Sequence, residues 1–422
     1  MLKTSHRLFS YAILSCALAV PALDTSAVAG PAPVDATHRS AATPTQQATV
    51  WLRDTALAPG YPGARLLIAT PEHVLVDVSA GHRDLARHEP LPADAIYRIY
   101  SMTKPIVSAA VLRLLAEGHG DFDDPVGEHL PDLAGLYRVD DDGTHRPAVP
   151  TIRQLLTHTA GFAVEGPALA RREAARLEDS GDLADYVRRL AEIPLDSEPG
   201  TAFRYDSAAL DVLGRLVEVW SGQPLERYMR AEFFEPLGMH DTGFSVPVRQ
   251  RDRVVELSTT GDDGRLVIAD EPHARHPGIR LRPYPSAAGG LYSTAADYLA
   301  FVRMLMNGGE HAGHRYLPRN MVERMFSDQL APMGLADPHT DATGGQGFGL
   351  GLAVLQDPAL RGRSGGPGQV GWSGAASTYF VIDPHRRIAG ILLLQHLPRD
   401  VPADLPRLAL PFYNFVQQVA AP

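Results

Sequence analysis

Short apolar runs with β-strand composition stand near both ends of this sequence, and their placement constrains its fold most strongly. Residues 65–69 and 74–78 flank the turn-forming segment 70–73 and predict a β-hairpin. Three further β-rich runs lie near the C-terminus: residues 348–355, 376–382 and 388–395. Because strands bury their apolar faces by sharing a packed layer, we expect one sheet built from both termini.

The sequence between those runs is patterned for helices. Apolar residues recur at helical spacing in residues 106–117, 152–156, 183–191, 210–220, 225–234 and 298–306, and residues 405–419 predict a closing helix. Residues 254–257 and 266–269 predict a small hairpin. The predicted fold class is therefore α/β, in the α+β arrangement, with one sheet and a mostly helical insertion.

Composition excludes several classes of function. The 422 residues are 45% hydrophobic, which is enough to bury a large core. Net charge is −10 and no basic run is present, so nucleic-acid binding is excluded because phosphate contacts need clustered cations. One cysteine permits neither a disulfide framework nor a Cys-rich zinc site, and no H-E-x-x-H motif occurs. We expect no metal and no cofactor.

The N-terminal residues have the pattern of an export signal. Lys3 and Arg7 precede residues 8–23, which are almost free of charge and too short for a membrane span. We interpret residues 1–29 as a signal peptide cleaved after Ala29, and the Pro-, Ala- and Thr-rich residues 30–47 as a linker. This predicts a periplasmic or secreted protein without stable membrane insertion. A retained anchor and a lipoprotein attached at Cys16 stay as alternatives.

After that cleavage, residues 48–422 form a single predicted catalytic domain, and one pair of residues in it suggests chemistry. Ser101 and Lys104 form an S-x-x-K motif, and Pro105 places both in the first turn of the helix predicted over residues 106–117. Residues three apart share a helix face, so the Lys104 amine can reach the Ser101 hydroxyl and act as its base. The alternative is an exposed lysine beside a capping serine.

The choice of cation at this position is informative. Of the 39 basic residues, 37 are Arg and only Lys3 and Lys104 are Lys. Lys3 leaves with the signal peptide. An arginine side chain does not give up its proton in proteins, whereas a lysine amine can. The mature chain therefore uses Lys only where a base is predicted.

Two other segments can complete such a site. Residues 199–207 run into the helix at 208, and Tyr205 there can relay a proton between a base, a serine and a leaving group. The alternative for Tyr205 is a buried structural side chain. Residues 371–375 have the sequence Gly-Trp-Ser-Gly-Ala and are predicted to enter a strand, where a backbone N–H can join that of Ser101 in an oxyanion hole.

These three motifs, in this order, resemble those of the serine β-lactamase and penicillin-binding-protein superfamily. The similarity is to its class C-like branch, with family VIII carboxylesterases nearest. Further segments carry the resemblance: G-H-R-D-L at 81–85, L-L-T-H-T-A-G at 155–161, P-L-G-M at 236–239 and G-G-L-Y-S-T at 289–294. The resemblance implies an antiparallel sheet from about 60–100 and 345–422, flanked by helices, with a helical subdomain at about 120–340.

The resemblance also implies a role for each site residue. Ser101 is the acylated nucleophile, Lys104 its base and Tyr205 the partner acid and base. The Ala375 and Ser101 N–H groups form the oxyanion hole, and His158 is structural.

Departures from the family pattern suggest the substrate. Ser207 stands where β-lactamases and peptidases of this group have Asn, and Trp372 stands where they have Lys. Losing a cation that faces a carboxylate forfeits about 1.5–3 kcal/mol. Trp372, Ser373, Gly374 and Ser207 are the predicted substrate-binding residues, and they favour neutral esters.

We therefore predict an exported serine hydrolase, a carboxylesterase that cleaves small neutral esters through an acyl-enzyme on Ser101. The expected partner is a small ester or a β-lactam-like molecule, and the oligomeric state is left open. The alternatives are a β-lactamase or D-Ala-D-Ala carboxypeptidase, an acyltransferase, and an acyl-trapping sensor. Ser364 lies in a G-x-S-x-G motif, but Pro367 and Gly368 follow it instead of the helix that a nucleophile elbow requires.

Overall fold

The computed structural model describes residues 42–162, 166–335 and 344–419, so the predicted signal peptide lies outside the described residues. Within the described residues the main sheet has seven strands in the order β11-β12-β13-β14-β15-β1-β2. The strands are β1 Gly63–Ala69, β2 Val74–Gly81, β11 Gln346–Phe348, β12 Ala353–Leu355, β13 Val370–Gly374, β14 Thr378–Asp383 and β15 Ile388–Leu393. Every neighbouring pair is antiparallel.

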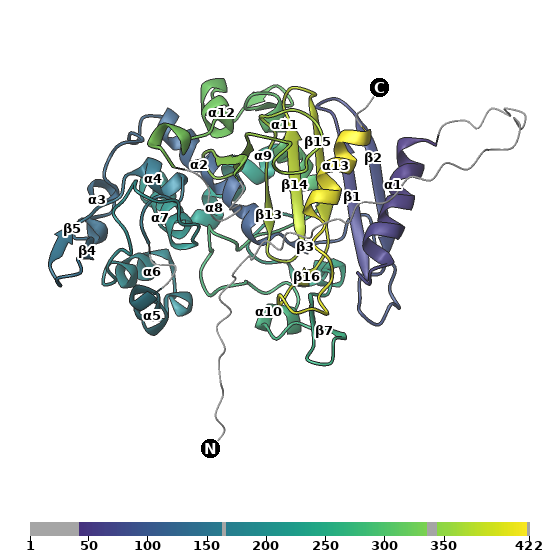
Figure 1. Ribbon diagram of the computed structural model, residues 1–422, viewed down its shortest axis with the longest axis horizontal. Helices are drawn as coiled ribbons and strands as arrows, with labels where there is room; N and C mark the ends of the chain where they lie inside the picture. Colours follow the sequence, from purple (N-terminus) through teal and green to yellow (C-terminus); the bar gives the residue numbers. More distant parts are fainter. Residues whose placement is uncertain (1–41, 163–165, 336–343, 420–422) are drawn as a thin grey trace, which may run out of the picture.

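The two ends of the chain meet inside this sheet. β1 pairs with β15 in the register Leu67 to Ile391, and Figure 1 shows the purple N-terminal strands beside the yellow C-terminal ones. The predicted fold class is confirmed, including the predicted hairpin, which forms β1 and β2. Helices are the main regular structure of the teal and green residues between the two parts of the sheet.

Helices cover both faces of the sheet. Side chains of β15 alternate between two apolar clusters, with Ile391 on the inner face and Leu392 on the outer. The outer face packs against α1 (Pro44–Leu52) and α13 (Ala409–Val419), and the inner face against α2 (Thr103–Ala116) and α11 (Ala295–Met306). Because both of its faces are buried, β15 is apolar throughout.

The remaining elements are short except for α7, which has 14 residues. The helices are α3 Val126–His129, α4 Ile152–Leu156, α5 Gly166–Ala174, α6 Leu183–Leu190, α7 Ala208–Ser221, α8 Leu225–Met229, α9 Glu235–Leu237, α10 Pro272–Arg275 and α12 Arg319–Phe326. The small strands are β3 Tyr97–Arg98, β4 Tyr137–Val139, β5 His145–Pro147, β6 Ser258–Thr260, β7 Leu266–Ile268, β8 Tyr292–Ser293, β9 Glu310–His311, β10 His314–Arg315 and β16 His396–Leu397.

Several predicted boundaries were wrong for identifiable reasons. The linker ends before residue 44, because Thr43 caps α1 in a capping box with Gln46. The run 348–355 is two strands, since the Gly349 N–H bonds back to the Leu352 carbonyl in a turn. The small hairpin begins at residue 258 instead of 254, because Val254 bridges Ile96 instead of the second strand of the hairpin. The closing helix begins at residue 409 instead of 405.

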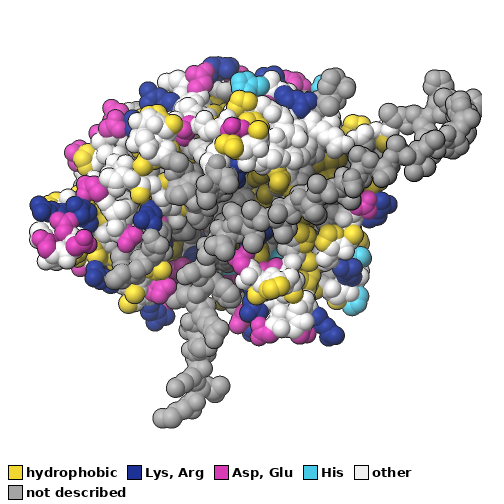
Figure 2. Space-filling view, viewed as in Figure 1, with side chains coloured by type: hydrophobic (Ala, Val, Ile, Leu, Met, Phe, Trp, Pro, Cys, Tyr) yellow, Lys and Arg dark blue, Asp and Glu magenta, His cyan; other side chains and the backbone are white. Residues whose placement is uncertain are grey.

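Charges of opposite sign are mixed on the surface. On the face drawn in Figure 2, the side chains of Lys and Arg are interspersed with those of Asp and Glu. Among the described residues, Arg253 pairs with Asp94 and with Asp241. Pairs of this kind contribute little to stability, but they leave this face without an extended basic surface. Across the described ranges, no helix is both long enough and apolar enough to span a membrane.

Gly390 of β15 allows α13 to lie directly on the sheet. A Cβ at this position would overlap Val416 and press on Phe412. We predict that Gly390→Ala lowers the free energy of unfolding by about 1–3 kcal/mol, measured by chemical denaturation. Gly135→Ala is the matched control, because its Cβ meets no atom within 4 Å, and it should change stability by less than about 0.5 kcal/mol. Equal effects of the two substitutions would contradict this account.

Candidate active site

Ser101 lies in a short 3₁₀ turn, Tyr100–Met102 (η2), that leads directly into α2. Pro105 is the third residue of α2, where its missing N–H costs no bond within the helix. Tyr100 has a φ of 45°, in the left-handed region that residues with a side chain seldom adopt. The helix therefore begins beside Ser101, as the position of Pro105 predicted.

Lys104 is buried against Ser101. Its side chain is one turn further along α2 and the residue is 1% exposed, so the alternative of an exposed lysine is wrong. The amine Nζ donates to Ser101 Oγ at 3.2 Å and to the Ala288 carbonyl oxygen at 2.7 Å. It also lies 4.8 Å from the centre of the Tyr205 ring. The amine thus has a fixed position beside the serine hydroxyl.

His158 accepts hydrogen bonds from the two residues that flank Tyr205 in the sequence. The His158 carbonyl accepts the Arg204 N–H at 2.8 Å, and its Nδ1 accepts the Asp206 N–H at 3.3 Å. The buried imidazole ring lies 4.6 Å from the Tyr205 ring, measured between centroids. The predicted structural role of His158 therefore has a physical basis, because this side chain orders the segment that carries Tyr205.

Trp372 joins the third motif to the other two. Its indole N–H donates to the Tyr205 hydroxyl at 3.3 Å, and the two ring centroids are 5.2 Å apart. Residues 371–374 were expected to precede a strand, but they belong to β13, in which Trp372 pairs with Phe380. Ser373 pairs with Tyr379, so strand alternation directs its side chain to the opposite face from Trp372.

The end of β13 lies against the chain that precedes Ser101. A Cβ at Gly374 would overlap the Ile99 carbonyl oxygen, so glycine is required for this close approach. Ala375 and Tyr100 pack against one small apolar cluster that includes Leu257 and Ala376. Ala375, the predicted second member of the oxyanion hole, is therefore beside the turn that carries the nucleophile.

Ser207 is exposed at the N-cap position of α7. The helix is capped instead by Asp206, whose Oδ1 accepts the Ala209 N–H at 3.1 Å. Asp206 is buried, and burial raises the pKa of its carboxyl above the usual range, opposed chiefly by the charge of Arg172. Of the four predicted substrate-binding residues, Ser207 is the one that is exposed at the surface, at the start of α7.

Sequence reasoning missed a second buried carboxylate, Asp211. It lies in the first turn of α7 and accepts bonds from Ser286 Oγ at 2.9 Å and from the Ala288 N–H at 3.1 Å. Burial raises the pKa of Asp211 to about 6, opposed first by its bond from Ser286. The available signal was an acidic residue within an apolar helical run, where an unpaired charge is costly.

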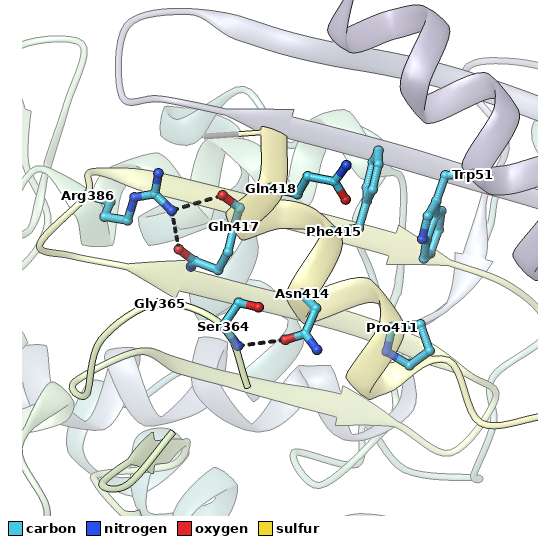
Figure 3. A pocket seen from close by; sticks show the side chains of 9 residues that line it. All are labelled: Trp51, Ser364, Gly365, Arg386, Pro411, Asn414, Phe415, Gln417 and Gln418. Atoms are coloured by element: carbon cyan, nitrogen blue, oxygen red, sulfur yellow. Dashed lines mark hydrogen bonds between the residues drawn. The ribbon is translucent and has the colours of Figure 1, made fainter. Parts of the chain in front are cut away.

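A cavity of about 380 Å³ lies away from these residues, on the outer side of the sheet (Figure 3). It is lined by Trp51, Ser364, Gly365, Arg386, Pro411, Asn414, Phe415, Gln417 and Gln418. The Ser364 N–H donates to Asn414 Oδ1 at 2.7 Å, and the next regular element is β13 instead of a helix. Ser364 therefore lacks the strand–turn–helix setting of a nucleophile elbow.

The chain is similar to known proteins over most of its length. Residues 45–411 match the family model described as Beta-lactamase. Esterase EstB of Burkholderia gladioli is 33% identical over 356 residues, which cover 78% of this chain and 85% of EstB. A lovastatin esterase of Penicillium rubens is 29% identical over 370 residues, covering 79% and 89%.

Solved structures show the same fold. The structure of EstCE1, described as a hydrolase with promiscuous acyltransferase activity, superposes with a TM-score of 0.70 and 25% identity, and covers 89% of this chain and 96% of EstCE1. The match of the family model spans most of the sequence, and the relatives include esterases. The chain therefore belongs to the beta-lactamase family and is a serine hydrolase.

Proposed function

We propose that this protein is a carboxylesterase that hydrolyses small neutral esters through an acyl-enzyme on Ser101. The observation that carries the proposal is the contact of the Trp372 indole with the Tyr205 hydroxyl at 3.3 Å. By the family resemblance, this uncharged ring stands where the β-lactamases and peptidases of the group have a lysine that faces a substrate carboxylate. A neutral acyl or alcohol group loses nothing from this exchange, whereas an anionic substrate forfeits a charge-assisted hydrogen bond.

The first half of the reaction forms the acyl-enzyme. The Lys104 amine takes the proton of Ser101 as Oγ attacks the ester carbonyl carbon. Negative charge then develops on the carbonyl oxygen, which accepts bonds from the Ser101 and Ala375 N–H groups. Tyr205 gives its proton to the departing alcohol and regains one from Lys104, whose amine is 4.8 Å from its ring centre.

The second half releases the acid. Water attacks the acyl carbonyl as it gives a proton to Tyr205, which passes its own proton to the Lys104 amine. Lys104 then gives that proton to Ser101 Oγ, which leaves as the hydroxyl while the acid is released. Ser373 and Gly374 border the bound acyl group with their backbone, and Ser207 lies at the exposed rim where the substrate enters. The names of the esterase relatives support an ester as substrate.

Acyl transfer to an alcohol other than water is a second candidate. The same acyl-enzyme serves both reactions, and the relative EstCE1 is described as having promiscuous acyltransferase activity. We also propose that the protein is exported, on the basis of Lys3, Arg7 and the uncharged run 8–23.

Replacing the nucleophile tests the proposal directly. Ser101→Ala should lower kcat/KM for p-nitrophenyl butyrate by at least about 1,000-fold, because no acyl-enzyme forms. Intact-mass spectrometry of the wild-type protein, quenched during turnover, should show an acyl adduct that the variant lacks. Retention of the full rate by the variant would refute the assignment. A stable adduct without turnover would instead favour an acyl-trapping sensor.

The role of Lys104 as the base is tested with a variant that keeps a positive charge but cannot lose a proton. Lys104→Arg should lower kcat by at least about 100-fold, since a guanidinium cannot accept the Ser101 proton. Circular dichroism and thermal unfolding establish that the variant is folded. Near-normal turnover by a folded Lys104→Arg protein would remove Lys104 from the mechanism.

Substrate class is decided by parallel assays. The wild-type protein should turn over p-nitrophenyl acetate and butyrate with a higher kcat/KM than a chromogenic cephalosporin or a D-Ala-D-Ala peptide. A carboxylate on the substrate should lower kcat/KM by about 10- to 100-fold, the equivalent of the lost charge-assisted bond. Faster turnover of the cephalosporin would reverse the assignment in favour of a β-lactamase.

A further inference from the structure

The Lys104 amine depends on a second element for its position. α2 places it beside Ser101, but the shorter of its two hydrogen bonds, 2.7 Å, goes to the carbonyl oxygen of Ala288. Ala288 is in the loop of residues 284–291, which is far from α2 in sequence. A lysine side chain has four rotatable bonds, so its amine stays in place only where such acceptors stay in place.

This loop is fixed at one end by Asp211. Oδ1 of Asp211 accepts bonds from Ser286 Oγ and from the Ala288 N–H, and Oδ2 accepts one from the Tyr284 hydroxyl at 3.3 Å. Asp211 is 2% exposed and Ala288 is 3% exposed, so water does not replace these bonds. One carboxylate therefore holds three donors from a single five-residue stretch.

The other end of the loop is fixed by the nucleophile segment itself. The Leu291 N–H donates to Thr103 Oγ1 at 3.2 Å, and the Leu291 carbonyl accepts the Ile99 N–H at 3.0 Å. Between these ends, the Gly290 N–H closes a turn on the Ser286 carbonyl at 2.9 Å. With one end held beside Ser101, the position of Ala288 is set by what holds the other end.

We propose that Asp211 is a positioning residue for catalysis, which fixes Ala288 and thereby holds the Lys104 amine within reach of Ser101. Asp211 does not touch the reacting atoms. It acts through the three hydrogen bonds to the loop, and these need an acceptor oxygen more than they need a negative charge. This inference rests on the proposed role of Lys104 as the base.

Two substitutions separate the acceptor from the charge. Asp211→Asn keeps Oδ1 for Ser286 and Ala288, and its amide can donate to the Tyr284 hydroxyl. Asp211→Ala removes all three bonds. We expect Asp211→Ala to lower kcat for p-nitrophenyl butyrate at least 10-fold with KM within threefold of wild type. We expect Asp211→Asn to have a kcat within threefold of the wild-type value.

Asp297 supplies a matched control. It also lies in the first turn of a helix, α11, is 8% exposed, and accepts bonds from the Asp241 N–H and Thr242 Oγ1, both at 2.8 Å. Asp297→Ala should lower the melting temperature as Asp211→Ala does, yet leave kcat within threefold. If kcat falls in both variants in proportion to their loss of stability, Asp211 has no positioning role. A folded Asp211→Ala protein with wild-type kcat would also overturn the proposal.

A milder variant covers the case in which Asp211→Ala does not fold. Ser286→Ala removes one of the three bonds and should lower kcat two- to fivefold without changing KM. An unchanged kcat in that variant would contradict the proposal.

Labelling distinguishes failure of this inference from failure of the proposed function. The rate at which a fluorophosphonate modifies Ser101, followed by intact mass, should fall at least 10-fold in Asp211→Ala and stay near wild type in Asp297→Ala. If the fluorophosphonate labels Ser101 in the wild-type protein but no ester is hydrolysed, the proposed esterase function is refuted. The labelling rates of the two variants then still test the positioning role of Asp211. Labelling of Asp211→Ala at the wild-type rate would refute the inference alone. If Ser101 is not labelled and Ser101→Ala keeps its ester hydrolysis, both fail.

Discussion

The antiparallel pairing of β1 with β15 is the contact on which the remaining structure depends. It joins residues 65–69 to residues 389–393 and so closes the chain between its two ends. With the sheet complete, β13 lies two strands from β15, and its end lies against the chain that precedes Ser101. The helical residues between the two parts of the sheet then contribute Tyr205, Asp211 and the loop with Ala288 to the same place.

The site is assembled from neutral contacts around one amine. Lys104 Nζ faces a hydroxyl, a carbonyl oxygen and an aromatic face. Tyr205 in turn lies between Lys104, the imidazole of His158 and the indole of Trp372. Behind them Phe348 packs edge-on against Trp372, with ring centroids 5.2 Å apart. Buried aromatic packing of this kind holds side chains in single conformations, as acid–base catalysis requires.

Local signals in the sequence predicted much of this. The hairpin of β1 and β2 followed from two short apolar runs around a turn-forming segment. The start of α2 followed from Pro105, whose effect is confined to its own turn. Ser101 and Lys104 are three residues apart, so helix geometry alone brings them together. Tyr205 and residues 371–375 were candidates from their own segments, and the family resemblance linked them to Ser101, because no local rule does so.

Contacts between distant residues could not be predicted in this way. Asp211 and Ala288 are 77 positions apart, and nothing in the local pattern of either links them. The strand at Trp372 was missed because two glycines and a serine surround it, and such residues predict turns. Its strand conformation comes from the ladder with β14, a tertiary contact that overrides local preference.

The burial of Lys104 has a consequence for chemical access to the folded protein. Among the residues that the structure describes, Lys104 is the single lysine, and it is closed to solvent. An amine-specific reagent added to the folded protein therefore meets no exposed lysine within those residues. Modification at Lys104 therefore requires this buried amine to become exposed to solvent first. The rate of that modification therefore measures how often the folded protein exposes the Lys104 amine.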